Sequence, residues 1–467
     1  MFREHPVRIL KYSYKNIWLL IVPVFRIIRT FGLDTDRLCT WLKGAWIDIA
    51  SIGGILFFGL LQWHFSVIEI CGKSITFRNG LFIRTVTSVC TDNLCSASFE
   101  EPFFLRPFGT IRVSLSTNSG SFGKPDLKFV VSRKNAEIIR NAADPRLGIR
   151  TPHKSGVASI LMLSAFFSSS YSGAIFTAFF MFKGGSAARG IAEDSIEKIK
   201  AGSAELSDRL AAGIPSLFIT VGLISLGMWA VSFLANLLKY AGFSVHQDGD
   251  FHVVQHGLFS KRQAVFFRKG IYFSDLRQSL IMKLFGLYTE EIGCPGFGNS
   301  HRHMPVAQPM CRINPSVPEN EIIFIKPDSR SLFQYTWQPV LIQLILVIFY
   351  LAGKKFYPNY SQPAEMLLLT VGIPSVWLII CRITALKTGF VRLYQDKITV
   401  SCIKGFGFHT LTSDRKGLVK LTVRQNVFQR NSGKCSLRIH LFGAKSAKYT
   451  IKGLSYVETK KIFDIPR

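Results

Sequence analysis

An internal repeat constrains this chain more than any other feature of its sequence. Residues 268–286 read RKGIYFSDLRQSLIMKLFG, and residues 415–433 read RKGLVKLTVRQNVFQRNSG. Both segments begin with Arg-Lys-Gly, contain Arg-Gln, and carry a basic residue three positions before a closing glycine. A decayed copy at residues 91–109 keeps the basic residue and the glycine but has Glu100-Glu101 in place of Arg-Gln. Repeated segments of this kind are expected to form the same structural unit each time.

A second landmark, glycine followed by Leu-Phe or Phe, fixes the register of the copies. The landmark glycines are Gly80, Gly257 and Gly405, and the closing glycines are Gly109, Gly286 and Gly433. The two are separated by 29 residues in the first two copies and by 28 in the last. We expect all six glycines to occupy turns, because glycine is the residue that best tolerates left-handed backbone. The spacing predicts one module three times, over residues 66–150, 243–327 and 388–467.

The charge and hydropathy of the chain favour a membrane protein. Its 467 residues contain 57 Lys and Arg against 29 Asp and Glu, and 40 phenylalanines. The length predicts about three domains. Such an excess of positive charge favours a negatively charged neighbour, either nucleic acid or anionic lipid. Because the mean hydropathy is positive, we expect the neighbour to be anionic lipid and expect no nucleic acid.

Six apolar segments are predicted to cross the membrane in three pairs. They are residues 17–31, 46–65, 155–182, 213–238, 335–352 and 366–384. The first is shorter than the roughly 20 residues that a spanning helix needs, and Arg26 and Arg29 interrupt it. The alternative for residues 17–31 is a helix that lies in the interface. The three pairs lie in segments 1–65, which includes the N-terminal tail, 155–238 and 335–384. The second of these segments contains a polar loop at 183–211.

Each pair of spans is followed by a strand-rich module. Short apolar runs that alternate with polar residues, separated by Gly and Asn, are typical of antiparallel strands. Residues 132–144 then predict a closing helix with Ser132 as its N-cap. The fold class is therefore an α+β membrane protein with six transmembrane helices in three pairs, each followed by a small antiparallel β domain that a C-terminal helix closes.

Basic residues near the spans predict the orientation. Cytoplasmic segments are enriched in Lys and Arg, and the N-terminal tail carries Arg3, Arg8, Lys11 and Lys15. An even number of spans before each module places all three modules and both termini in the cytoplasm, at the inner membrane. If residues 17–31 lie in the interface instead, the first module changes sides. We expect no removable signal peptide.

The order of these elements resembles the bacterial pleckstrin-homology-like (PH domain) multi-pass membrane proteins of the YdbT type. The resemblance rests on Gly257-Leu258-Phe259, Arg277-Gln278, Lys283 and Gly286, and on their counterparts Arg424-Gln425, Arg430 and Gly433. It implies that each module is a small two-sheet PH-like structure closed by a C-terminal helix. The first module departs at Glu100-Glu101, and the third lacks the Leu of the first landmark. The resemblance implies no reaction, and a shared fold does not carry lipid binding with it.

The candidate site residues are the repeated cations and their neighbours. Arg277 and Arg424, each followed by a glutamine (Gln278 and Gln425), could hold a lipid phosphate or a partner carboxylate. They could equally tie a strand to its neighbouring loop or pack over a phenylalanine. Lys283, Arg430 and Arg106 precede the closing glycines, where bases contribute about 1 kcal/mol each near an anionic leaflet. Ordinary solvation of a turn explains the same positions.

No motif indicates catalysis, a cofactor or a metal. The sequence has no P-loop, no GxSxG and no HExxH. Its nine cysteines show no paired spacing and are expected to be free thiols in a reducing compartment. Cys294, His301, His303 and Cys311 share one segment but lack the tight paired spacing of a zinc site. We expect a protein that is not an enzyme and that binds no metal or cofactor.

These observations favour a scaffold over a transporter. The three modules are expected to form a binding or assembly surface that meets anionic lipid, further copies of the chain or a second membrane protein of the same family. A role in envelope stress or antimicrobial resistance fits such a scaffold. The alternative is a transporter or export-factor component, which would ordinarily place acids or histidines in mid-membrane. The last four spans contain almost none.

Overall fold

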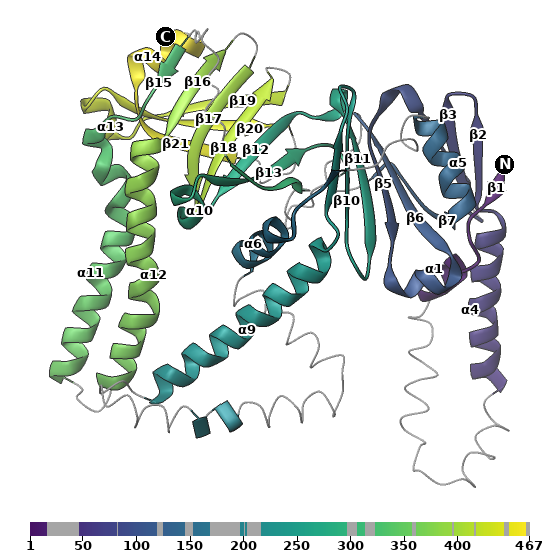
Figure 1. Cartoon of the computed structure of the whole chain (residues 1–467), viewed down its shortest axis with the longest axis horizontal. Helices are drawn as coiled ribbons and strands as arrows, with labels where there is room; N and C mark the ends of the chain where they lie inside the picture. Colours follow the sequence, from purple (N-terminus) through teal and green to yellow (C-terminus); the bar gives the residue numbers. More distant parts are fainter. Residues whose placement is uncertain are drawn as a thin grey trace. The chain divides into compact units, whose positions relative to one another are not determined.

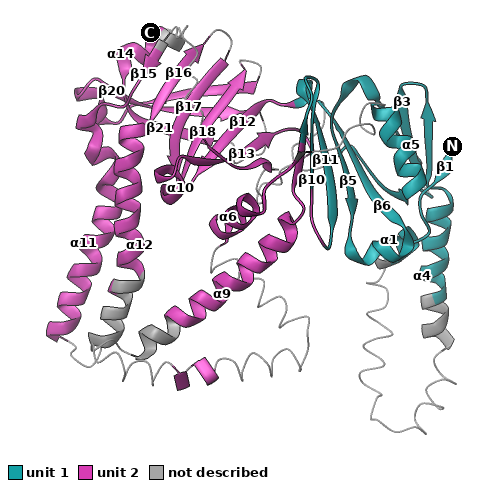
Figure 2. Cartoon of the chain, in the orientation of Figure 1, with its two compact units in different colours: residues 1–153, 246–255, 259–270 teal, residues 154–245, 256–258, 271–467 magenta. Residues whose placement is uncertain are grey.

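The chain folds into two compact units (Figure 2). The computed structural model describes residues 1–15, 46–81, 83–118, 125–144, 153–168, 197–199, 201–202, 216–296, 306–312, 323–356, 361–394, 397–414, 417–442 and 448–463. Unit 1 comprises residues 1–153, 246–255 and 259–270, and unit 2 comprises residues 154–245, 256–258 and 271–467. The division at residue 270 therefore falls inside segment 243–327.

In its described residues, unit 1 contains two antiparallel sheets and the helices α1, α4 and α5 (Figure 1). The first sheet has the order β1-β2-β3-β4, and the second contains the run β7-β6-β5-β11-β10. The strands are β1 (Phe2–Arg3), β2 (Val67–Cys71), β3 (Ser74–Asn79), β4 (Thr85–Cys90), β5 (Leu94–Glu101), β6 (Thr110–Thr117), β7 (Leu127–Ser132), β10 (Phe251–His256) and β11 (Lys261–Phe267). The helices are α1 (Arg8–Lys15), α4 (Trp46–His64) and α5 (Arg133–Ala143), with short 3-10 turns η2 (Thr91–Asn93), η3 (Phe103–Phe108) and η5 (Arg268–Gly270).

The core of unit 1 forms where the two sheets and α5 meet. Ile68 and Ile75 from the first sheet pack with Phe129 from the second and Ile139 from α5, and all four are fully buried. Alternation along each strand makes this possible, because successive side chains point to opposite faces. Helix α5 begins as predicted, since the Ser132 hydroxyl accepts a hydrogen bond from the Asn135 N–H. Such a cap satisfies an N–H that would otherwise lack a partner.

Unit 2 contains long apolar helices. These are α9 (Ser216–Tyr240), α11 (Leu332–Phe356) and α12 (Ser361–Thr388), and the shorter helices are α6 (Val157–Phe167), α10 (Leu280–Leu284), α13 (Val427–Asn431) and α14 (Tyr456–Phe463), with the turn η6 (Ser329–Ser331). Three stretches in the described part of the chain are long and apolar enough to cross a membrane: Gly222–Tyr240, Ser329–Phe356 and Val371–Thr388. They overlap the predicted spans 213–238, 335–352 and 366–384.

Two antiparallel sheets complete unit 2. One has the order β14-β13-β12-β18-β17-β16-β15, and the other has the order β19-β20-β21. Their strands are β12 (Phe273–Gln278), β13 (Leu287–Gly293), β14 (Val306–Arg312), β15 (Ile323–Ile325), β16 (Phe390–Tyr394), β17 (Lys397–Lys404), β18 (Gly407–Asp414), β19 (Leu418–Arg424), β20 (Lys434–Leu441) and β21 (Lys448–Ser455). Strands β8 (His153–Lys154) and β9 (Ser244–Gln247) fall where the chain passes between the units. The core of unit 2 includes Val400, Leu437 and Ile451 from three different strands.

The described part of the chain is thus α+β, with several antiparallel sheets and three apolar helices of spanning length. The arrangement of six spans in three pairs stays a prediction. Residues 17–31 and most of the loop at 183–211 lie outside the described residues. Of the predicted span 155–182, residues 157–167 form α6. Residues 46–64 of the second predicted span form α4.

Candidate membrane-facing site

A short helical turn precedes each closing glycine. Turn η3 links β5 to β6, α10 links β12 to β13, and α13 links β19 to β20. In each, the glycine N–H donates to the carbonyl of the basic residue three positions earlier: Gly109 to Arg106 at 2.9 Å, Gly286 to Lys283 at 3.3 Å and Gly433 to Arg430 at 3.2 Å. The three glycines have φ of 60°, 64° and 64°. The closing glycine is therefore the left-handed residue that ends the turn.

The glutamine of Arg-Gln spans this turn. Gln278 donates from Nε2 to the Leu287 carbonyl at 2.7 Å, and Gln425 donates to the Lys434 carbonyl at 2.8 Å. Each bond joins the end of one strand to the start of the next. Both glutamines consequently stabilise the repeat itself. At the matching place in unit 1, the Glu101 carboxylate has no N–H to donate and accepts from Arg133 Nε at 2.8 Å instead.

The two arginines of Arg-Gln have different surroundings. Arg277 lies inside unit 2, with Nη1 3.3 Å from Oε1 of the buried Glu291 and its guanidinium 5.1 Å from the centre of the Phe167 ring in α6. Arg424 is exposed, and its side chain has no ion pair or hydrogen bond within the part of the chain that the structure describes. The contacts of Arg277 match the alternative in which the arginine serves the fold. Arg424 is available to a ligand.

The three bases before the closing glycines also differ. Lys283 donates from Nζ to Thr388 Oγ1 at 2.6 Å at the end of α12, and its Nζ lies 4.3 Å from the centre of the Phe408 ring. Burial lowers the pKa of Lys283 to about 8. Arg106 lies 3.8 Å from the Glu101 carboxylate. Arg430 is exposed.

The landmark turn at Gly257 lies beside the end of the apolar helix α9 in unit 2. The Gly257 N–H donates to the Ala241 carbonyl at 2.8 Å, and the Leu258 N–H donates to the Leu238 carbonyl of α9 at 3.1 Å. The three landmark glycines all have positive φ: Gly80 121°, Gly257 107° and Gly405 64°. The side chain of Leu258 is 55% exposed. An apolar turn is thus held at the end of a helix of spanning length.

A buried acid, Asp275, links β12 to β18 in the seven-stranded sheet of unit 2, and sequence reasoning missed it. Asp275 in β12 is fully buried, and its Oδ2 lies 2.7 Å from His409 Nδ1 in β18 and accepts from the Tyr449 hydroxyl at 3.1 Å. Burial and the Asp275 carboxylate raise the pKa of Tyr449. Burial also raises the pKa of the adjacent Cys402 thiol to about 12. Only the placement of an acid among apolar residues, in FSDLRQ, could have signalled this cluster.

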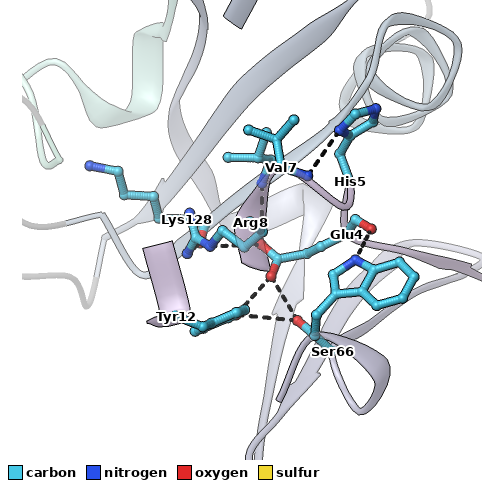
Figure 3. A network of polar contacts seen from close by, with 9 residues as sticks. Glu4, His5, Val7, Arg8, Tyr12, Ser66 and Lys128 are labelled. Carbon is cyan, nitrogen blue, oxygen red and sulfur yellow. Dashed lines mark hydrogen bonds and ion pairs between the residues drawn. The ribbon is translucent and has the colours of Figure 1, made fainter. Parts of the chain in front are cut away.

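A second buried acid anchors the N-terminal segment in unit 1 (Figure 3). Glu4 accepts from Tyr12 and Ser66 hydroxyls, both at 2.8 Å, and from the Val130 N–H at 3.2 Å. Its Oε1 lies 3.6 Å from Arg8 Nε. By its sequence, the segment of residues 1–15 is a basic tail. The structure instead holds this segment against β7 and the end of α4, because a buried carboxylate requires such partners.

The remaining candidates lie apart from any site. Cys294 is buried and Cys311 is half-buried, whereas His301 and His303 lie outside the described residues. Within the described ranges, no three Cys, His, Asp or Glu side chains gather to hold a metal ion. Phe408 is buried, and His409 is bound to Asp275. Phe406, on the turn before β18, is 50% exposed, and the expectation of no nucleic acid partner stays a prediction.

The fold and the repeated turns define a class: small antiparallel sheets attached to apolar helices of spanning length, with a closing helix after β7 (α5) and after β21 (α14). Residues 19–146 and 206–310 match the family model described as Bacterial PH domain. The chain belongs to this family. No curated protein and no solved structure matches it. The likeness of residues 388–467 to the two matched segments rests on the repeated landmarks, the short helix α13 and the closing helix α14.

Proposed function

We propose that the chain is a non-catalytic integral membrane protein whose three PH-like modules form a binding and assembly surface at the cytoplasmic face of the inner membrane. In this proposal six spans in three pairs carry the modules, and anionic lipid is the ligand of the exposed cations. Further copies of the chain, or a related membrane protein, are the proposed partners. We also propose a place for this scaffold in envelope stress or antimicrobial resistance.

The observation that carries the proposal is the geometry of the α11–α12 hairpin. Strand β15 leads through η6 into α11, and α12 leads directly into β16. Strands β15 and β16 pair with each other, with Ile325 opposite Val391. The chain therefore leaves one sheet, runs through two apolar helices and returns to the same sheet. Such a hairpin crosses a bilayer twice and keeps both of its ends on one side.

Two exposed arginines support anionic lipid as the ligand. Arg424 is the last residue of β19, and Arg430 lies on α13, the short helix that ends at the closing glycine Gly433. Neither side chain has a partner within the described ranges. Guanidinium groups bind phosphate oxygens in a bidentate manner, so two of them near one turn suit lipid headgroups. Arg277, Gln278, Gln425 and the paired Arg106 we assign to the fold instead.

The test uses the full chain, because β12 and β15, outside residues 388–467, pair with strands of that segment. Purified protein is reconstituted into vesicles that contain neutral lipid and a graded fraction of anionic lipid. Energy transfer from the native tryptophans to dansyl-labelled anionic or neutral lipid measures which lipid surrounds the protein. We expect anionic lipid to be enriched, and the enrichment to fall when salt is raised, because salt screens exposed charges.

Arg424→Ala combined with Arg430→Ala is the informative variant, and Arg438→Ala is its matched control. Arg438 is also exposed and lies on β20 of the same sheet. The double variant should lose most of the enrichment and the control should keep it. Equal losses in both would leave only general attraction between charges. No enrichment in the unmodified chain would show that the lipid assignment is wrong and would point to a protein partner.

A further inference from the structure

The short helices α10 and α13 display large apolar side chains to solvent. In α10 and the residue that follows it, Leu284 is 78% exposed and Phe285 is 69% exposed. In α13, Val427 is 75% exposed and Phe428 is 86% exposed. Single exposed apolar residues are common on protein surfaces, but a pair on the same short helix in each of two copies, at the end of α10 and at the start of α13, is not explained that way. These helices need a second, apolar neighbour.

Both short helices are fixed beside the ends of apolar helices that could span the membrane. Helix α10 packs Leu280 against Ala385 and Leu386 in the last turn of α12. Helix α13 is held at the first turn of α11, where Gln429 donates from Nε2 to Gln334 Oε1 at 2.8 Å. Figure 1 shows α10 and α13 at the ends of α11 and α12 that lie nearest the strands. The exposed apolar residues therefore sit where these helices leave the sheets.

The neighbouring surface of α11 has the character of a membrane interface. Phe333 in its first turn is 77% exposed, and Trp337, one turn further, is 43% exposed. Tryptophan and other aromatic rings favour the headgroup layer, where one face of the ring is apolar and the other is wet. Exposed bases lie at the same level, with Lys387 in the last turn of α12 and Arg430 on α13. This combination of apolar and basic side chains is typical of surfaces that lie in the interface of a bilayer.

We propose that Phe333, Leu284, Phe285, Val427 and Phe428 form an apolar collar that inserts into the boundary between headgroups and acyl chains. The proposal rests on the membrane placement of α11 and α12 in the proposed function and adds a second mode of attachment. The collar seats the β sheets directly on the bilayer surface, so that the cations near α13 reach lipid phosphates. The ligand of the collar is the bilayer interface itself, without a requirement for one headgroup.

Unit 1 carries the same feature at the equivalent turn. In η3, Phe103 is 60% exposed, Phe104 is 68% exposed and Phe108 is 55% exposed. The sequences FFLRPFG, LIMKLFG and VFQRNSG differ in detail, yet each places apolar side chains on the outside of a short turn that ends at a closing glycine. A turn that served only to connect two strands would gain nothing from exposed phenylalanines, because exposed apolar surface costs free energy in water.

The experiment places a photo-reactive amino acid, p-benzoylphenylalanine, at single positions of the full chain reconstituted into vesicles. The test positions are Phe285 and Phe428. Phe349, 56% exposed in the second half of α11, reports whether this helix lies in the bilayer. Lys397 is the matched negative control, because it is exposed at the end of β17 opposite the turn at 405–406, about 23 Å away at roughly 3.3 Å per residue. Mass spectrometry counts lipid adducts after irradiation.

We expect lipid adducts at Phe349, Phe285 and Phe428, with yields several-fold above that at Lys397. Adducts at Phe349 but only background yields at Phe285 and Phe428 would overturn the collar and leave the proposed function standing. Background yields at all four positions would overturn the membrane placement of α11 itself. Protein-to-protein crosslinks at Phe285 and Phe428, in place of lipid adducts, would assign the same surface to contact between chains. All four substitutions are at exposed positions, so folding of each variant is expected and is checked by size-exclusion chromatography.

Discussion

Neighbouring copies of the repeat join at two junctions, the strand pairs β5–β11 and β12–β18. The two junctions share one backbone arrangement but differ in their side chains. In unit 1, β11 pairs with β5, and in unit 2, β18 pairs with β12, both antiparallel. Glu100 and Arg277 hold equivalent places, nine residues before a closing glycine. In the strand register, Glu100 lies opposite Arg262 at the first junction, and Arg277 lies opposite His409 at the second. Arg262 and His409 are themselves equivalent, because each precedes the closing glycine of its copy by 24 residues. The backbone register at this position is therefore the same.

The side chains at the two junctions are solvated to different extents. At the unit 1 junction, Glu100 lies 3.3 Å from Arg262 and 3.6 Å from Arg112, and Arg262 is 43% exposed. At the unit 2 junction, Asp275 is fully buried with His409 and Tyr449. Exposed ion pairs contribute little to stability, whereas removing one member of a buried polar cluster leaves its partners unsatisfied. The comparison indicates that the β11–β5 pairing has only partly exposed ion pairs between side chains, whereas the β18–β12 pairing also depends on a specific buried acid.

The largest effect is expected from Asp275→Ala. The substitution leaves His409 and Tyr449 without their acceptor in a buried place and should destabilise unit 2 by about 3 kcal/mol. Hydrogen exchange of the β12 and β18 amides measures the local free energy of opening. Ser98→Ala is the matched control, because Ser98 occupies the equivalent position in unit 1, and its cost should be about 1 kcal/mol or less. Similar costs in both variants would remove the proposed difference between the junctions.

Gly417→Ala and Gly270→Ala test whether the junctions are alike in packing. A Cβ at residue 417 would lie 2.4 Å from the Tyr272 carbonyl oxygen, and one at residue 270 would lie 2.4 Å from Cys95 Cβ and 2.6 Å from its Cα. Backbone atoms cannot yield easily, so each change should cost about 2 kcal/mol. Thermal unfolding of the detergent-solubilised chain gives the measurement. Gly249→Ala, where a Cβ meets nothing within 4 Å, is the control and should change little.

The unit 2 junction should also respond to pH through Glu291. Burial raises the pKa of Glu291 above its ordinary 4.5, against the opposing effect of Arg277. The folded state therefore holds a proton that the unfolded state releases, and this contribution to stability is present below pH 4.5 and is lost as the pH rises through the raised pKa. Glu291→Gln should flatten that decline. Burial also raises the pKa of Glu290, so only the difference in stability between the variant and the unmodified chain reports on Glu291. If stability fell with pH in parallel for the two proteins, Glu291 would not be the group responsible.

The smallest effect is expected from Arg262→Ala in unit 1. Its ion pair with Glu100 is largely solvated, so its loss should cost about 0.5 kcal/mol or less. Arg277→Ala at unit 2 should cost more, because it leaves the buried Glu291 without its cation. Hydrogen exchange of β11 and β13 amides compares the two variants. If Arg262→Ala proved the more damaging change, the contrast between the junctions would be reversed.

Much of the local structure near the repeats could be predicted from the sequence. The landmark and closing glycines do occupy left-handed turns, and Ser132 does cap α5. Apolar helices lie at the predicted spans 213–238, 335–352 and 366–384. These features depend on backbone sterics, on capping and on the length of apolar runs, all of which are properties of a few neighbouring residues. The family resemblance rested on the same local signals and is confirmed for two segments.

The candidate site was predicted less completely, because its residues share a pattern but not an environment. Arg277 and Arg424 look equivalent in sequence, yet one is held by Glu291 and Phe167 and the other is exposed. Glu4 was not predicted as a buried residue, because it lies among basic residues and its partners Ser66 and Val130 are distant in sequence. A residue's neighbours across 62 or 126 positions cannot be inferred from spacing within one chain. A repeated pattern alone does not separate a residue that binds a ligand from one that stabilises the fold.

The sequence by itself determined where the chain turns, where it is apolar enough to enter a bilayer and which short segments are repeated. The tertiary structure alone decided which strands pair, so that β11 joins β5 and β18 joins β12, each across two copies of the repeat. The physical reason is that turns and apolar helices are set by local conformation and solvation, whereas any antiparallel edge with a matching apolar face can accept a strand. The buried Asp275 cluster exists only because that long-range pairing brings residues 275, 409 and 449 together.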